Sequence, residues 1–129
     1  MSVVKGCHHI ALRASNLEKS VNFYKALGLT ERVRWEGAVM LDMGDGSCIE
    51  IFGGGEDKER IDERFLHLAF KVDDVDLAFK TAIEAGAAEK YAPYEACPPT
   101  AVPSIKMLVA FVYGPDGELL EFFKEITEQ

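Results

Sequence analysis

Residues 9–29 read HIALRASNLEKSVNFYKALGL, and residues 67–87 read HLAFKVDDVDLAFKTAIEAGA. The two stretches align without a gap and share one pattern, although few residues are identical. Each begins with a histidine and an alternating apolar run, passes through a polar pair into an amphipathic stretch, and ends in a short apolar stretch that holds a glycine. The alternation predicts a strand, and the longer period that follows predicts a helix. The sequence therefore predicts two copies of one strand–helix unit.

The polar pair marks the start of each predicted helix. Ser15 or Asn16 can cap the first helix, and Asp73 or Asp74 can cap the second, because these side chains accept hydrogen bonds from free N–H groups of the first turn. Apolar residues then recur at helical spacing along one face of each stretch. The glycine near the end of each copy stands where a helix end favours a positive φ.

A second pair of matching segments follows the helices. Residues 44–52 read GDGSCIEIF and residues 115–123 read PDGELLEFF, and in each an Asp-Gly turn leads into an apolar strand that holds one glutamate. The second copy is longer between its helix and this strand, and the Pro-rich stretch 91–103 is the expected site of the extra residues. We interpret that stretch as a surface loop that could lie over a pocket.

Further strands complete the predicted architecture. They are expected at 30–35, 38–42, 88–91 and 105–113. Each half is then a strand, a helix and three more strands. The predicted fold class is α+β, with one domain over residues 1–129 made of two βαβββ modules, at about 5–55 and about 63–127.

Composition excludes several classes of protein. A net charge of −8 argues against a nucleic-acid binder, which needs a basic surface to neutralise phosphates. No apolar run approaches the length of a membrane span, and the chain begins without a signal-peptide pattern, so we expect a cytoplasmic protein. Cys7, Cys48 and Cys97 are far apart and form no CxxC, so we expect reduced thiols rather than disulfides or a thiolate zinc site.

Four polar residues interrupt the apolar strands. Side chains alternate between the two faces of a strand, and the apolar residues on either side of each polar one point to the core. His9, Glu50, His67 and Glu121 are therefore expected on the faces opposite the main apolar sets. The same parity puts His8 on the other face from His9, where we predict a structural role.

The recurrence of one histidine and one glutamate in both halves decides their interpretation. Taken singly, a histidine or glutamate in a strand is usually half-buried or solvent-facing. A duplicated architecture can instead bring all four side chains into one cleft. Two imidazoles and two carboxylates at one point form a ligand set for a divalent cation such as Zn²⁺, Ni²⁺, Co²⁺, Mn²⁺ or Fe²⁺.

The sequence also resembles a known family. HHIALRASNLEKSVNFYKALGL at 8–29 is similar to the opening of vicinal oxygen chelate proteins, the superfamily of glyoxalase I and bleomycin-resistance proteins. HLAFKVDDVDLAF at 67–79 and VAFVYGPDGELLEFF at 109–123 are similar to its second-half signatures. The resemblance implies paired βαβββ modules forming a cupped sheet around a metal, and in many members a homodimer.

Within that superfamily the resemblance is greatest to glyoxalase I, which uses His, Glu, His and Glu as metal ligands. It implies that His9, Glu50, His67 and Glu121 bind the metal, with Ni²⁺ or Zn²⁺ favoured over Co²⁺, Mn²⁺ or Fe²⁺. The implied reaction converts a methylglyoxal–thiol hemithioacetal into a 2-hydroxyacyl thioester through an enediolate. Either glutamate can be the first base; we favour Glu121, with Glu50 as its partner.

The implied substrate site is less complete. Arg13 matches a glyoxalase I arginine that meets the thiol cosubstrate, whereas Gly54 stands where that family has an asparagine that contacts glutathione. A methylmalonyl-CoA epimerase-like isomerase is the alternative enzyme, although such epimerases commonly have Gln in place of Glu50. A metal-free protein that sequesters a small molecule is the alternative outside enzymes. The sequence is consistent with a site completed in one chain and with one shared by two subunits.

Overall fold

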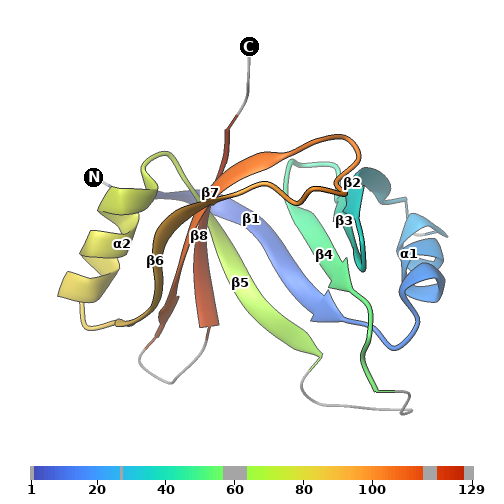
Figure 1. Cartoon of the computed structure of the whole chain (residues 1–129), viewed down its shortest axis with the longest axis horizontal. Helices are drawn as coiled ribbons and strands as arrows, with labels where there is room; N and C mark the ends of the chain where they lie inside the picture. The colour runs from blue at the N-terminus through green and yellow to red at the C-terminus, as the bar shows by residue number, and fades with distance from the viewer. Residues whose placement is uncertain (1, 27, 57–63, 115–118, 127–129) are drawn as a thin grey trace.

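The computed structural model describes residues 2–26, 28–56, 64–114 and 119–126. Within them the chain forms one curled eight-stranded sheet with two helices on its outer face (Figure 1). The first half contains β1 (Val4–Arg13), α1 (Leu17–Ala26), β2 (Thr30–Trp35), β3 (Ala38–Asp42) and β4 (Cys48–Phe52). The second half contains β5 (Phe65–Val72), α2 (Val75–Glu84), β6 (Ala88–Ala96), β7 (Lys106–Tyr113) and β8 (Leu119–Ile126).

The strand order places both halves in the same sheet. It runs β2-β3-β4-β1-β5-β8-β7-β6, so β1 and β5 meet at the centre as an antiparallel pair. The strand β4 lies next to β1 and runs parallel to it, and on the other side of the pair β8 lies next to β5 and runs parallel to it. The strand order therefore reads the same outward from the centre in each half. The α+β prediction and the predicted βαβββ order of each half agree with this arrangement.

The two helices cover separate parts of the outer face. On α1, Val21 packs with Leu41 of β3 and Ile51 of β4 in a buried cluster. On α2, Val75 and Ala78 pack in a second cluster formed with the outer faces of β7 and β8. Within the described residues, neither helix is long and apolar enough to cross a membrane.

The second helix begins as its sequence predicts. Asp74 has an extended backbone, and its side chain accepts a hydrogen bond of 3.0 Å from the backbone N–H of Leu77. This bond satisfies one of the free N–H groups of the first helical turn. The Asp-Gly turn predicted at 116–117 lies outside the described residues.

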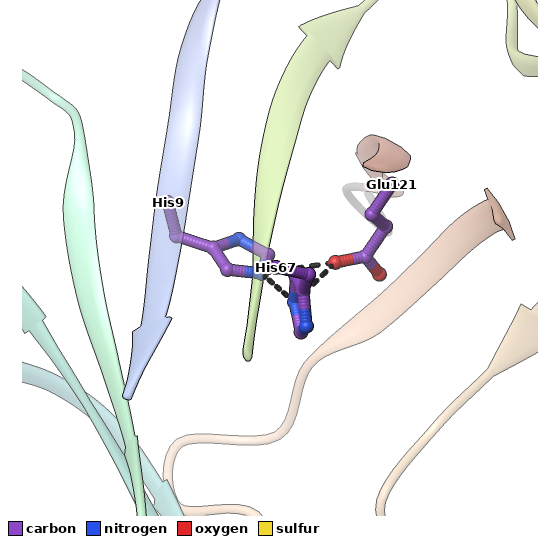
Figure 2. A group of neighbouring side chains, drawn as sticks. All are labelled: His9, His67 and Glu121. Carbon is purple, nitrogen blue, oxygen red and sulfur yellow. Dashed lines mark hydrogen bonds and ion pairs between the residues drawn. The ribbon is translucent and has the colours of Figure 1, made fainter. Parts of the chain in front are cut away.

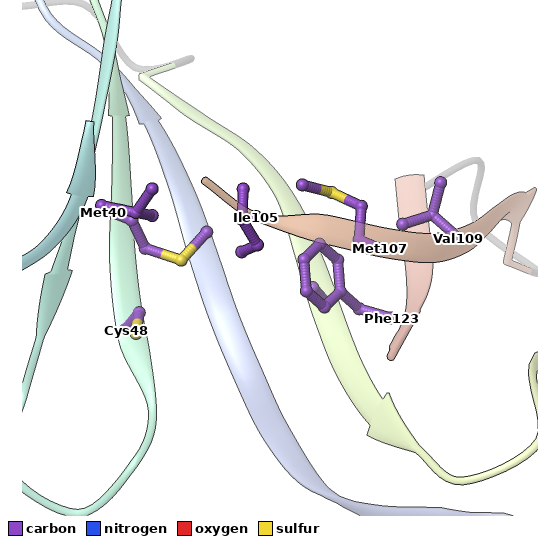
Figure 3. Packing of buried hydrophobic residues seen from close by; sticks show 8 residues of the cluster. Met40, Cys48, Ile105, Met107, Val109 and Phe123 are labelled. Carbon is purple, nitrogen blue, oxygen red and sulfur yellow. The ribbon is translucent and has the colours of Figure 1, made fainter. Parts of the chain in front are cut away.

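A third apolar cluster lies inside the curl of the sheet (Figure 3). Its members come from both halves, and include Met40 of β3, Met107 and Val109 of β7, and Phe123 of β8. Ile105, just before β7, packs in the same cluster. Burial of these side chains joins the two halves across the interior, beyond the hydrogen bonds between β1 and β5.

The stretch 91–103 differs from the prediction of a surface loop. Residues 91–96 continue β6, and only the residues after Ala96 leave the sheet. Pro93 is tolerated there because β6 is an edge strand, and among the described residues no strand pairs with its outer side. The following segment crosses to the opposite edge of the sheet, where Val102 forms backbone hydrogen bonds with Arg34 of β2 (Figure 1).

Candidate metal centre

The four predicted site residues lie on the four central strands, on the inner face of the sheet. His9 is on β1, Glu50 on β4, His67 on β5 and Glu121 on β8. Their arrangement follows from strand register and from two small side chains. Ala11 pairs with both Glu50 and His67. On the other side, Ala69 pairs with both His9 and Glu121.

These two alanines leave room for the larger side chains beside them. Both are fully buried and share the inner face with the residues that surround them. A methyl group in the middle of the arrangement lets the imidazoles and carboxylates lean toward a common point. The structure thus completes the cluster within one chain, which was one of the two arrangements that the sequence allowed.

The four functional groups converge closely, and Figure 2 shows three of them, those of His9, His67 and Glu121. The His9 Nε2 atom lies 3.0 Å from Glu121 Oε1, 3.1 Å from Glu50 Oε1 and 3.2 Å from His67 Nε2. The His67 Nε2 atom lies 3.0 Å from Glu121 Oε1 and 3.6 Å from Glu50 Oε1. His9, His67 and Glu121 offer ligand atoms that all lie within 4.8 Å of one another.

The carboxylates lack the hydrogen bonds that buried charges normally have. The Oε1 atoms of Glu50 and Glu121 are buried without a hydrogen-bond partner, although imidazole nitrogens lie near them. The contacts of these oxygens with the imidazole nitrogens, at 3.0–3.6 Å, are ion pairs. A buried anionic oxygen without a partner is costly. A cation held by His9, His67 and Glu121, with Glu50 beside the two imidazoles, would remove that cost, so this donor set fits a divalent metal.

Protonation in the metal-free cluster follows from burial and charge. Burial alone would lower the pKa of His9, but the carboxylates of Glu121 and Glu50 outweigh it and raise this pKa to about 9. The pKa of His67 is raised for the same reasons. Burial alone would raise the pKa of Glu50, but the two imidazoles lower it to about 2. In the absence of a metal cation, protonated imidazoles therefore supply the positive charge that balances the two carboxylates.

Aromatic side chains surround the cluster on the inner face. The ring of Phe111 meets His67 edge-on, with the ring centroids 5.5 Å apart. Tyr94 of β6 is near enough to Glu121 for that carboxylate to act with burial in raising the tyrosine pKa. An apolar groove of about 710 Å³ runs over Ile10, Leu68 and Leu120 and is also lined by His67. The three apolar side chains alternate with the cluster residues, so this part of the groove lies on the outer face.

Arg13 lies apart from the four-residue cluster. It is the last residue of β1, and its side chain is exposed. Its guanidinium donates a hydrogen bond of 2.9 Å to the carbonyl oxygen of Gly53 and lies over the Phe52 ring. The structure therefore places Arg13 at the end of β1, beside the glycine-rich segment after β4.

The predicted position of His8 on the opposite face is wrong. The pairing of β1 with β5 shifts register between Cys7 and His9, which indicates a β-bulge at this point. The bulge breaks the alternation, so both histidines are buried and their Nδ1 atoms lie 2.8 Å apart. His8 Nε2 in turn lies 2.9 Å from Glu125 Oε2.

Sequence reasoning missed Glu125 and its partner Arg32. Glu125 follows Glu121 by four residues on β8, and even spacing puts both on the inner face. Arg32 of β2 pairs with the same Glu125 oxygen and also donates to Cys48 Sγ at 3.5 Å. The even spacing from Glu121 could have placed Glu125 on the inner face. Its contact with His8, however, depends on the β-bulge, which the sequence does not indicate.

Comparison with known proteins places this arrangement in a family. The family model described as the Glyoxalase/Bleomycin resistance protein/Dioxygenase superfamily matches residues 6–122, and the chain belongs to that superfamily. The resemblance inferred from the sequence is thereby confirmed. A search of curated proteins finds no match.

Solved structures show the same fold. The methylmalonyl-CoA epimerase of Mycobacterium tuberculosis is 17% identical with a TM-score of 0.68, over 98% of this chain and 92% of that one. A second methylmalonyl-CoA epimerase is 16% identical with a TM-score of 0.71, over 98% and 99% of the two chains. The Mn(II)-bound glyoxalase of Novosphingobium aromaticivorans is 19% identical with a TM-score of 0.68, over 95% of this chain and 40% of that one.

Proposed function

We propose that this protein is a metal-dependent enzyme of the glyoxalase I type, which converts the hemithioacetal of methylglyoxal and a thiol into a 2-hydroxyacyl thioester. The observation that carries the proposal is the convergence of His9, Glu50, His67 and Glu121, with two buried carboxylate oxygens that lack hydrogen bonds. Such oxygens are ready to bind a cation or to accept a proton. Membership of the superfamily supports the same reading.

The four residues would hold the divalent metal, and we favour Ni²⁺ or Zn²⁺. Such a cation polarises a carbonyl oxygen and stabilises the negative charge that develops when the neighbouring carbon loses a proton. The two imidazoles would keep the site in place, since His9 is fully buried and the His67 side chain is only 9% exposed. Substrate oxygens would bind the metal in place of water or of one of the two carboxylates.

The glutamates would carry the proton. In the proposed reaction Glu121 takes the proton from C1 of the hemithioacetal and returns it to C2, while the hydroxyl proton passes from the C1 oxygen to the C2 oxygen, so that no proton is gained or lost overall. Glu50 is its partner on the opposite side, because β4 and β8 flank the central β1–β5 pair. A positioned carboxylate of this kind contributes about 10²–10⁴-fold to the rate.

An epimerase is the second candidate function. Two carboxylates that approach from opposite sides could remove a proton from one face of a carbon next to a thioester and return it to the other face. This reading is favoured by the two solved methylmalonyl-CoA epimerases of the same fold. It needs the same metal and the same two glutamates, so the substrate alone distinguishes the two reactions.

The thiol or acyl carrier of the substrate would bind near the end of β1. Arg13 is the proposed contact for an anionic group there, since it is exposed and cationic. Its present partners are a backbone carbonyl and an aromatic ring, so a carboxylate or phosphate can replace them without leaving a buried charge unpaired. The homodimer stays a prediction that analytical ultracentrifugation would measure.

The proposal is tested by metal content followed by turnover. The purified protein would be analysed for bound metal, stripped with a chelator, and reloaded with Zn²⁺, Ni²⁺, Co²⁺, Mn²⁺ or Fe²⁺. Each form would be assayed with methylglyoxal plus several thiols, and separately for exchange of the α-hydrogen of methylmalonyl-CoA in D₂O. We expect metal-dependent thioester formation from methylglyoxal.

Other outcomes of these assays would assign the protein to one of the alternative functions. Hydrogen exchange in methylmalonyl-CoA without thioester formation from methylglyoxal would establish the epimerase reading instead. A protein that neither binds divalent metals nor turns over any of these substrates would belong with the metal-free binding proteins. Glu84→Gln is a matched control for variants of the two glutamates, because Glu84 is an exposed acid at the end of α2.

A further inference from the structure

A second polar cluster lies directly behind His9. It consists of His8 on β1, Glu125 on β8 and Arg32 on β2. The contacts form a chain, from Arg32 to Glu125, from Glu125 Oε2 to His8 Nε2 at 2.9 Å, and from His8 Nδ1 to His9 Nδ1 at 2.8 Å. The His9 Nε2 atom, at the far end, faces the candidate metal centre. None of these three residues belongs to the proposed ligand set.

The cluster is built into the fold rather than lying on a mobile surface. His8 is only 4% exposed, because the bulge in β1 turns it to the inner side with His9. The Phe123 ring, which is 1% exposed, packs against both imidazoles, with centroid distances of 4.0 Å to His8 and 5.0 Å to His9. The three rings therefore pack against one another, and close packing of this kind restricts the orientation of both imidazoles.

The direction of the hydrogen bonds between Glu125 and His8 and between His8 and His9 follows from which atoms carry protons. The Glu125 carboxylate also receives the Arg32 guanidinium, so it acts as an acceptor and the proton lies on His8 Nε2. A neutral His8 then has a bare Nδ1, and the short contact between the two Nδ1 atoms needs a proton from His9.

We propose that Glu125 and His8 are positioning residues that hold the His9 ring with its proton on Nδ1 and its bare Nε2 turned toward the metal. Glu125 orients His8, His8 orients His9, and Arg32 anchors Glu125 at the solvent side. This inference rests on the proposed function only in that a metal is taken to bind at Nε2. The hydrogen bond from His9 Nδ1 to His8 Nδ1 exists with or without the metal.

The hydrogen bond can be observed without any metal or activity. The chain has three histidines, so labelling with ¹⁵N-histidine produces few ring signals to assign. We expect a slowly exchanging proton on His9 Nδ1 and a scalar coupling between His9 Nδ1 and His8 Nδ1 across the hydrogen bond. A His9 ring without a proton on Nδ1, or a proton on His8 Nδ1 instead, would overturn the assignment.

The effect on metal binding is tested with two variants of His8. H8F keeps a ring against Phe123 but removes the acceptor, whereas H8N restores an acceptor at nearly the place of the imidazole Nδ1. Zn²⁺ affinity would be measured by competition with a chromophoric chelator, and the Co²⁺-loaded proteins by their visible spectra. We expect H8F to bind Zn²⁺ about 10–100-fold more weakly than the wild type and to shift the Co²⁺ spectrum, because loss of an outer hydrogen bond weakens its ligand by about that factor. H8N should stay close to the wild type in both measurements.

The outcomes separate this inference from the proposed function. Unchanged Zn²⁺ affinity in H8F, or equal losses in H8F and H8N, would show that His8 acts by packing and would overturn the positioning role. A wild-type protein that shows the coupling between the two histidines but no metal binding would contradict the proposed function and leave the hydrogen bond established. Thermal unfolding of the metal-free variants monitors whether packing is preserved.

Discussion

Metal affinity should rise steeply between pH 7 and pH 9. In the metal-free protein the carboxylates of Glu121 and Glu50 raise the pKa of His9 to about 9, against the effect of burial. Its ring is therefore protonated at pH 7, and a cation can bind at Nε2 only after that proton leaves. Glu50, with a pKa lowered to about 2, is already ionised and adds no dependence in this range. The metal affinity should therefore fall as the pH falls below about 9.

The magnitude follows from the distance between pH and pKa. At pH 7 the solution is two pH units below the pKa of His9, so proton competition weakens binding about 100-fold, or about 2.7 kcal/mol. Raising the pH from 7 to 9 should recover most of this factor. The raised pKa of His67 makes the dependence steeper in the same direction.

The assay is a chelator competition titration at pH 6, 7, 8 and 9, with the chelator's own protonation corrected. Calorimetry in two buffers of different ionisation enthalpy counts the protons released at each pH. The Glu121→Gln variant is the internal comparison, because removing one of the two charges that raise the pKa of His9 should flatten the curve. A constant affinity from pH 7 to pH 9, with no proton released, would refute the reasoning.

Three further predictions concern catalysis and stability. Glu121→Gln should lower turnover by about 10²–10⁴-fold while the protein still binds metal, and a variant with near-wild-type turnover in a steady-state assay would contradict its role as base. Phe123→Ala should destabilise the protein by about 3–5 kcal/mol in urea unfolding, since the ring is buried against both histidines, whereas Phe65→Ala, at a side chain 67% exposed, should change it little. Asp74→Ala should cost about 1 kcal/mol in the same measurement through loss of the helix cap; equal costs for Asp74→Ala and for Asp73→Ala, which removes no cap, would show that capping is not the cause.

Elements with a clear period were predicted well from the sequence. The strands expected at 30–35 and 38–42 have those bounds, and both helices begin after the predicted polar pairs. The reason is local: burial of one face demands a period of two in a strand and 3.6 in a helix, and caps follow from side-chain chemistry. The four cluster residues were found for the same reason, as polar exceptions to an apolar period.

Prediction was wrong where an element interrupts its own period. The bulge before His9 adds a residue to β1 without any mark in the sequence, so parity assigned His8 to the wrong face. The strand β6 contains Pro93 and few apolar residues, and residues 91–96 therefore have the composition of a loop. Its pairing with β7 outweighs that composition, because an edge strand needs hydrogen bonds on only one side.

The sequence by itself determined the class of fold, the order of elements in each half and the two histidines and two glutamates that share a face, since each of these depends on short-range periodicity. Only the tertiary structure decided that one chain completes the cluster, that Ala11 and Ala69 leave the space for it, and that Glu125 and His8 lie behind His9. These depend on strand order and register, which are set by contacts between residues far apart in the chain. No local pattern encodes them, because each requires the packing of the whole sheet.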